Sequence, residues 1–237
     1  MASKLQYMSA LSQHTSHEIT SNPVRWLSFL NTASNVYKYP FSDQLMIYAQ
    51  RPDTFACATL EIWNTKMNRW VNRGAKGIAL IDDSGPRARL KYVFDIRDTH
   101  LGRDGRTPYL WQLGDEHMEP IRDHLIETYG LDADTYLLRD ALMAAAEKNV
   151  MDNLDIYFYD FRTAVDGSFL EELDEHNQLV RFRETLIKSV QYMLLYRCGL
   201  DPETSLDIED FSYIATNDEI SKNDFELTIS LYVTDDV

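Results

Sequence analysis

The sequence predicts an α+β protein in which an N-terminal domain of helices packs on a small antiparallel sheet and a mostly helical acidic region follows. Three observations support this fold class. Apolar residues recur at helical spacing early in the chain, short apolar strands flank turn residues in its middle, and helical spacing returns after residue 114. We expect one domain over residues 1–108 and a second region, an interaction module, over residues 109–237.

The dipeptide Asn22-Pro23 predicts the start of a helix. Asn can cap backbone N–H groups of the first turn, and Pro lacks the N–H that the first turn would leave unbonded. An apolar stripe at helical spacing follows, and we assign it to the core. Its members are Trp26, Phe29, Leu30, Ala33 and Tyr37.

A second helix is expected between two prolines, Pro40 and Pro52. Ser42 is the predicted capping residue of this helix. Phe41 and Met46 have the spacing of a hydrophobic staple around that cap.

The middle of the first domain predicts a short helical piece over 60–67 and then a β-hairpin. The apolar run 77–81 is one strand, the turn residues 83–86 follow, and 90–96 is the antiparallel partner. Gly74 and Gly77 bracket a tight turn before the hairpin.

Residues 101–108 look like the connection between the two parts of the chain. Beyond it, helices are expected over 120–129, 133–149 and 179–197, the last with Gly199 at its C-terminal cap. Asp201-Pro202 predicts a further helix start, and strict alternation of apolar residues over 225–233 predicts a strand.

The net charge of −15 is unevenly distributed along the chain. Residues 1–114 hold 14 Lys and Arg against 9 Asp and Glu, whereas residues 115–237 hold 9 against 29. A basic part can face nucleic-acid phosphates, while the acidic part must face another partner.

No window approaches about 18 consecutive apolar residues, and the first 13 residues lack a signal-peptide pattern, so we expect a cytoplasmic protein without a membrane partner.

A basic and aromatic cluster lies between Lys66 and Lys91, where seven basic residues outnumber two acidic ones. This combination suits single-stranded nucleic acid, because cations follow the backbone while exposed bases stack on aromatic rings. The alternative is a solvated charged surface over buried tryptophans. The candidate strand-binding residues are Arg51, Trp63, Arg69, Trp70, Arg73 and Lys76.

Three segments, 41–52, 70–80 and 93–99, together with Trp63, resemble the N-terminal domain of ArdC-type antirestriction proteins. Similar segments stand at the front of large polyproteins of conjugative elements. The resemblance covers about residues 23–99 and implies single-stranded DNA binding by a protein that helps a mobile genetic element survive host restriction. The turn 72–77 lacks one basic and one acidic residue of the family pattern, which implies weaker binding than in relatives. Arg73 and Lys76 remain, beside glycines that let a phosphate approach the backbone.

The sequence contains none of the common catalytic motifs that we considered. ArdC-like proteins carry HExxH in a C-terminal metalloprotease-like domain, and that motif is absent here. Pro120 stands between His117 and His124, so we expect no metal site there. No GxSxG, P-loop or GxGxxG occurs, and the many carboxylates indicate a solvated surface. We expect no enzyme activity and no cofactor. The best remaining polar group, expected to cap turns, comprises Asp95, Asp98 and His100.

The leading hypothesis is therefore a non-enzymatic protein of a mobile element that binds single-stranded DNA. The alternative belongs to another class: an anti-restriction or anti-CRISPR protein, which inhibits a host defence nuclease. In that hypothesis the acidic C-terminal half presents carboxylates to the basic channel of a restriction or Cas nuclease and competes with DNA.

Overall fold

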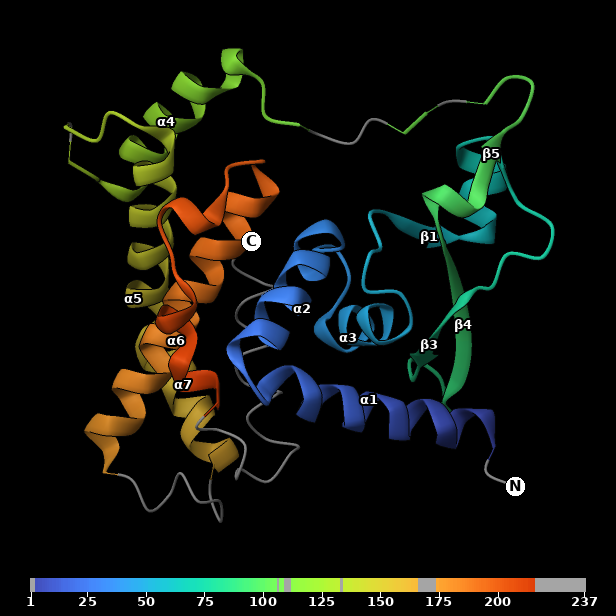
Figure 1. Ribbon diagram of the computed structural model, residues 1–237, viewed down its shortest axis with the longest axis horizontal. Helices are drawn as coiled ribbons and strands as arrows, with labels where there is room; N and C mark the ends of the chain where they lie inside the picture. The colour runs from blue at the N-terminus through green and yellow to red at the C-terminus, as the bar shows by residue number, and fades with distance from the viewer. Residues whose placement is uncertain (1–2, 106, 109–111, 133, 166–173, 216–237) are drawn as a thin grey trace.

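The computed structural model describes residues 3–105, 107–108, 112–132, 134–165 and 174–215, and it is α+β as predicted (Figure 1). Helices α1 (Lys4–Thr20), α2 (Pro23–Asn35) and α3 (Phe41–Gln50) come first, and a small strand region follows. The second part of the chain contains α4 (Asp115–Tyr129), α5 (Leu138–Val165) and α6 (Glu175–Arg197), followed by short helical turns at Pro202–Thr204, Ile208–Phe211 and Ser212–Ala215. The strand expected over 225–233 lies outside the described residues.

Helix α2 begins where the sequence predicts, because the side chain of Asn22 accepts the backbone N–H of Arg25 at 3.0 Å. The prediction for α3 is wrong in detail. This helix begins at Phe41 directly after Pro40, so Ser42 lies inside it and makes no capping bond. The expected staple is absent as well, since Phe41 and Met46 pack into two different hydrophobic clusters.

Helix α1 was not predicted from the sequence. The Ser3 side chain accepts the N–H of Gln6, and the Gln6 side chain accepts the N–H of Ser3 in return, which caps the helix. Three of its buried residues are small and polar: Thr15, Ser16 and Thr20. A helix that buries small polar side chains has a weak apolar stripe, which explains why periodicity does not reveal it.

The main sheet has the antiparallel order β1-β4-β3, formed by β1 (Cys57–Thr59), β3 (Ile78–Asp82) and β4 (Arg89–Asp95). The predicted hairpin is confirmed, with Ile81 opposite Leu90. The Gln50 side chain of α3 covers the outer edge of β3, because its amide bonds the N–H of Ala79 at 2.9 Å and the carbonyl of Ala79 at 2.8 Å.

A second, smaller ribbon pairs β2 (Arg69–Val71) with β5 (Thr99–Leu101) in antiparallel register. A short π-helix, η1 (Ile62–Lys66), precedes β2, and a 3₁₀ turn, η2 (Ile96–Asp98), joins β4 to β5. The helical piece expected over 60–67 is therefore confirmed. Neither strand of the ribbon was predicted, because three residues are too short to show alternation.

The predicted C-terminal helices exist with different bounds. Helix α4 starts at Asp115 and runs through Pro120, and α5 starts at Leu138 but continues to Val165. Helix α6 buries an apolar face that includes Phe182, Leu186, Val190 and Met193, and Gly199 follows the helix with a left-handed φ of 69°. No helix among the described residues is both long and apolar enough to cross a lipid bilayer.

Helix α2 connects the two parts of the chain. Its buried stripe packs in one hydrophobic cluster with residues of α5 and α6, and the Trp26 indole donates a hydrogen bond to Ser189 at 2.9 Å. A second cluster joins α1 and α3 to β3 and β4. Figure 1 shows this arrangement, with the strands on one side of α2 and α3 and the long helices α5 and α6 on the other. The domain boundary at residue 108 stays a prediction, and the core of α2 is shared across it.

Candidate nucleic-acid interface

The β2–β5 ribbon presents one aromatic ring to solvent. Trp70 lies in the middle of β2 opposite His100 of β5, and its side chain is 50% exposed. Because side chains alternate along a strand, Trp70 and Asn72 project on the face opposite to Arg69. Asn72 extends the pairing, with its N–H bonded to the carbonyl of Asp98 at 2.8 Å. Its side-chain oxygen lies 2.7 Å from Nδ1 of His100.

The turn after β2 carries the cations nearest in sequence to Trp70. The N–H of Ala75 bonds the carbonyl of Asn72 at 3.0 Å, and Gly74 adopts a φ of 88° that favours glycine. Arg73 and Lys76 are exposed. Within the described chain neither side chain has an acidic partner. We name the surface formed by Trp70, Asn72, Arg73, Lys76 and His100 the ribbon face.

Ion pairs neutralise most of the carboxylates elsewhere in the first part of the chain. Asp43 binds Lys91, Asp82 binds Arg89, and Glu18 binds Arg25. Arg51 and Arg97 take up three further carboxylates, those of Asp53, Asp95 and Asp98. Each of these pairs also uses a Lys or Arg side chain. The net positive charge of residues 1–114 therefore comes from basic side chains outside these pairs, among which are Arg73 and Lys76.

Two predicted site residues lie in the interior, which corrects the expectation that they contact DNA. Trp63 is only 3% exposed, and its indole N–H donates to the carbonyl of Phe94 at 2.8 Å. Arg69 is 8% exposed, has its guanidinium carbon 6.0 Å from the centroid of the Trp63 ring, and donates to the hydroxyl of Thr99 at 2.8 Å. A buried indole offers no face to a base, so these two residues hold η1 against the ribbon instead.

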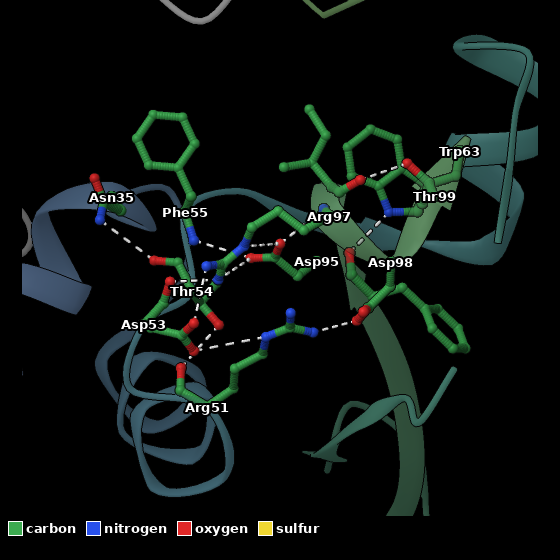
Figure 2. Close-up of polar contacts among 12 residues, drawn as sticks. Asn35, Arg51, Asp53, Thr54, Phe55, Trp63, Asp95, Arg97, Asp98 and Thr99 are labelled. Carbon is green, nitrogen blue, oxygen red and sulfur yellow. Dashed lines mark hydrogen bonds and ion pairs between the residues drawn. The ribbon is translucent and has the colours of Figure 1, made fainter. Parts of the chain in front are cut away.

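A third predicted residue, Arg51, belongs to a polar network that Figure 2 shows. Its guanidinium pairs with Asp98 and lies 3.7 Å from a carboxylate oxygen of Asp53. Arg97 bonds the carboxylates of both Asp53 and Asp95 at 2.8 Å. The network fastens the segment after α3 to the end of β4, so the charge of Arg51 is already compensated.

Asp95 is the buried centre of this network. It is fully buried, and one carboxylate oxygen accepts the N–H of Phe55 at 2.9 Å while the other accepts the N–H of Arg97 at 2.8 Å. Burial alone raises the pKa of this carboxyl, but the hydrogen bonds from Arg97 and Phe55 outweigh burial and hold the pKa below its ordinary value. Asp95 therefore caps the η2 turn as an ionised side chain, which confirms the turn-capping prediction for this member of the group; the Asp98 side chain instead pairs with Arg51, and the His100 side chain contacts Asn72.

The two glycines of the expected phosphate-binding turn have different roles. A side chain at Gly74 would meet no atom within 4 Å, so the backbone there is open to a ligand. A Cβ at Gly77 would lie 3.1 Å from the Phe94 ring and 3.2 Å from the Tyr92 ring. Gly77 is therefore packed tightly under two aromatic rings, and close approach of a phosphate at Gly74 stays a prediction.

Of the six predicted site residues, the structure leaves Trp70, Arg73 and Lys76 exposed and within seven residues of one another in the sequence. Sequence reasoning assigned no binding role to Asn72 and His100, which share the ribbon face. Only the pairing of β2 with β5 could have revealed His100, because it lies 30 residues after Trp70. Gly102 supports the same face, since a Cβ there would lie 2.8 Å from Nε1 of Trp70.

Pro120 was expected to interrupt the helix between His117 and His124 and so to prevent a metal site there. That expectation about the helix is wrong, because α4 is continuous through Pro120. Among the residues that the structure describes, no group of three or more His, Cys, Asp or Glu side chains is placed to hold a metal ion.

Comparison of the chain with protein-family models, with curated proteins and with solved structures found no match.

Proposed function

We propose that this chain binds single-stranded DNA through the ribbon face, as a non-enzymatic protein of a mobile genetic element with a role in antirestriction. The observation that carries the proposal is the half-exposed Trp70 indole, which is followed directly by a turn with two unpaired cations. A base stacked on an exposed ring contributes ~1–3 kcal/mol, and the adjacent cations attract the phosphates. The antirestriction role rests on the sequence resemblance to ArdC-type proteins.

The test is the affinity for a fluorescent oligo-dT over a range of salt concentrations. The double variant Arg73→Ala/Lys76→Ala should bind more weakly, and the slope of log K against log salt should fall by about 0.7 for each phosphate that the variant no longer neutralises. A matched control is Lys148→Ala/Arg162→Ala, which removes the same charge from exposed positions on α5. Equal affinities of the two double variants would refute the assigned interface.

A second candidate function, inhibition of a defence nuclease, is favoured by the solvent side of α5. This helix exposes Met151, Ile156 and Tyr159 among the carboxylates of Asp152 and Asp155. Apolar side chains surrounded by acidic groups suit a basic protein surface better than a nucleic acid.

The second candidate predicts that the chain binds a restriction or Cas nuclease in the absence of DNA. Under this hypothesis, the change Tyr159→Ala/Asp155→Asn should weaken capture of the nuclease, while Arg73→Ala/Lys76→Ala should not. Retention of the nuclease by the α5 variant would exclude this surface.

A further inference from the structure

A cleft lies where the two parts of the chain meet. Its walls come from the C-terminal ends of α2 and α6 and from the segment leading into β1, and its volume is about 850 Å³. Pockets for small molecules commonly span ~300–1,000 Å³. In a chain with a net charge of −15, the described part of the lining holds two cations, Lys38 and Arg197, and one carboxylate, Asp201.

Arg197 is the unusual side chain of this cleft. It is partly buried, and its guanidinium stacks 4.2 Å from the centroid of the Tyr37 ring. Within the described residues it has neither an acidic partner nor a hydrogen-bond acceptor. Other partly buried arginines are bonded, for example Arg51 to Asp98 and Arg183 to Glu184.

Stacking leaves the donors of Arg197 available. The centroid of the Tyr37 ring lies 4.2 Å from the guanidinium carbon, and the ring provides no oxygen acceptor for the five N–H groups of the guanidinium. The carbonyls at the end of α6 accept the backbone N–H groups of Cys198, Gly199 and Leu200 at 2.9–3.0 Å, and among the described residues none of them accepts a hydrogen bond from Arg197. A phosphate suits these free donors, since a guanidinium binds phosphate in a bidentate manner.

The remaining charged and titratable side chains of the lining allow an anion to enter. Lys38 is exposed and lies 5.7 Å from the centroid of the same Tyr37 ring. The Asp201 carboxylate is engaged by the N–H of Glu203 at 3.1 Å. Burial raises the pKa of the Cys57 thiol to about 12 and also raises that of Cys198, so both thiols are neutral.

An aromatic ring from another segment of the lining, the one that leads into β1, supplies the second half of a site. Phe55 is 46% exposed although its backbone is fixed by the hydrogen bond of its N–H to Asp95. Figure 2 shows the ring pointing away from the polar network of Asp95 and Arg97. An exposed aromatic ring on an anchored backbone offers a stacking surface to a planar ligand.

We propose that this cleft binds a nucleoside monophosphate, with the phosphate on Arg197 and Lys38 and the base against Phe55. The ligand is either a free nucleotide or one nucleotide of a bound strand. The proposal stands on residues outside the ribbon face, so it does not depend on the function proposed above.

The test titrates deoxyadenosine monophosphate into the full chain and follows binding by calorimetry. We expect Arg197→Gln and Phe55→Ala each to weaken binding by about tenfold. The matched control is Arg181→Gln, because Arg181 also lies on α6 and also stacks on a tyrosine, Tyr213, but does not line the cleft. Deoxyadenosine alone and inorganic phosphate alone should each bind more weakly than the nucleotide. Thermal unfolding of each variant checks that it is folded.

Saturable nucleotide binding that Arg197→Gln weakens and Arg181→Gln does not would support the site. A short oligo-dA then identifies the source: weaker binding to Arg197→Gln assigns the cleft to a strand, and unchanged binding assigns it to a free nucleotide. Absence of saturable nucleotide binding to the wild-type chain, or equal effects of the two arginine variants, would overturn the proposal. A different result would refute the proposed DNA binding by the ribbon face: an oligo-dT affinity that Arg73→Ala/Lys76→Ala leaves unchanged.

Discussion

The two tryptophans at positions 63 and 70 should respond in opposite ways to truncation. Trp63 is 3% exposed and hydrogen-bonded to the carbonyl of Phe94, so Trp63→Ala removes a large buried ring and should destabilise the fold by ~3–5 kcal/mol. Trp70 is 50% exposed, so Trp70→Ala should change stability by only about 0.5 kcal/mol. If bases stack on Trp70, the same change should lower DNA affinity by ~1–3 kcal/mol, or about 5- to 150-fold.

Urea unfolding followed by far-ultraviolet circular dichroism measures the first effect, and anisotropy of a labelled oligo-dT measures the second. Tyr159→Ala is the control, because it removes an exposed ring from α5 without touching the ribbon face. The reasoning fails if Trp70→Ala destabilises the protein as much as Trp63→Ala does. It also fails if Trp70→Ala binds DNA as tightly as the control.

Two further predictions concern the supports of the ribbon face. Because the folded-state pKa of Asp95 lies below its unfolded value, the ionised carboxylate stabilises the fold above about pH 4, and that contribution is lost as the pH falls through the folded-state pKa. Asp95→Asn should therefore be less stable than wild type at neutral pH and should lose less stability on acidification. The midpoints of urea unfolding, measured from about pH 7 to about pH 3, test this expectation. Parallel pH profiles of the two proteins would contradict it. Gly74→Ala should cost ~1–2 kcal/mol through its φ of 88° alone, because no atom lies near the added methyl, and thermal unfolding that matches wild type would exclude that strain.

Capping residues and turn residues were sufficient to predict the elements whose bounds depend on a few neighbouring residues. Asn22 and Pro23 specify the start of α2, and the turn residues after Asp82 specify the β3–β4 hairpin. The helix predicted to end at Asn149 was too short. The apolar spacing of α5 continues through Leu154 and Phe161, and no glycine or proline ends the helix before Val165. Helix α1 gives no such signal, because small polar residues fill much of its buried face.

The candidate site could be predicted only as a region of sequence. Trp63 and Trp70 stand seven residues apart, and neither periodicity nor charge in the surrounding sequence distinguishes the buried Trp63 from the exposed Trp70. The burial of Trp63 depends on its contact with the carbonyl of Phe94, which lies 31 residues further along the chain. In the same way, the ion pair of Arg51 with Asp98 is a tertiary contact that charge counting does not reveal.

The most direct test of the ribbon face is quenching of tryptophan fluorescence by oligo-dT in a Trp111→Phe background. Trp26 and Trp63 are buried, so a stacked base can reach only Trp70 among the three remaining indoles. We predict saturable quenching that disappears on a further Trp70→Phe change. Quenching that persists without Trp70, or no quenching at oligonucleotide concentrations that saturate binding, would contradict the account.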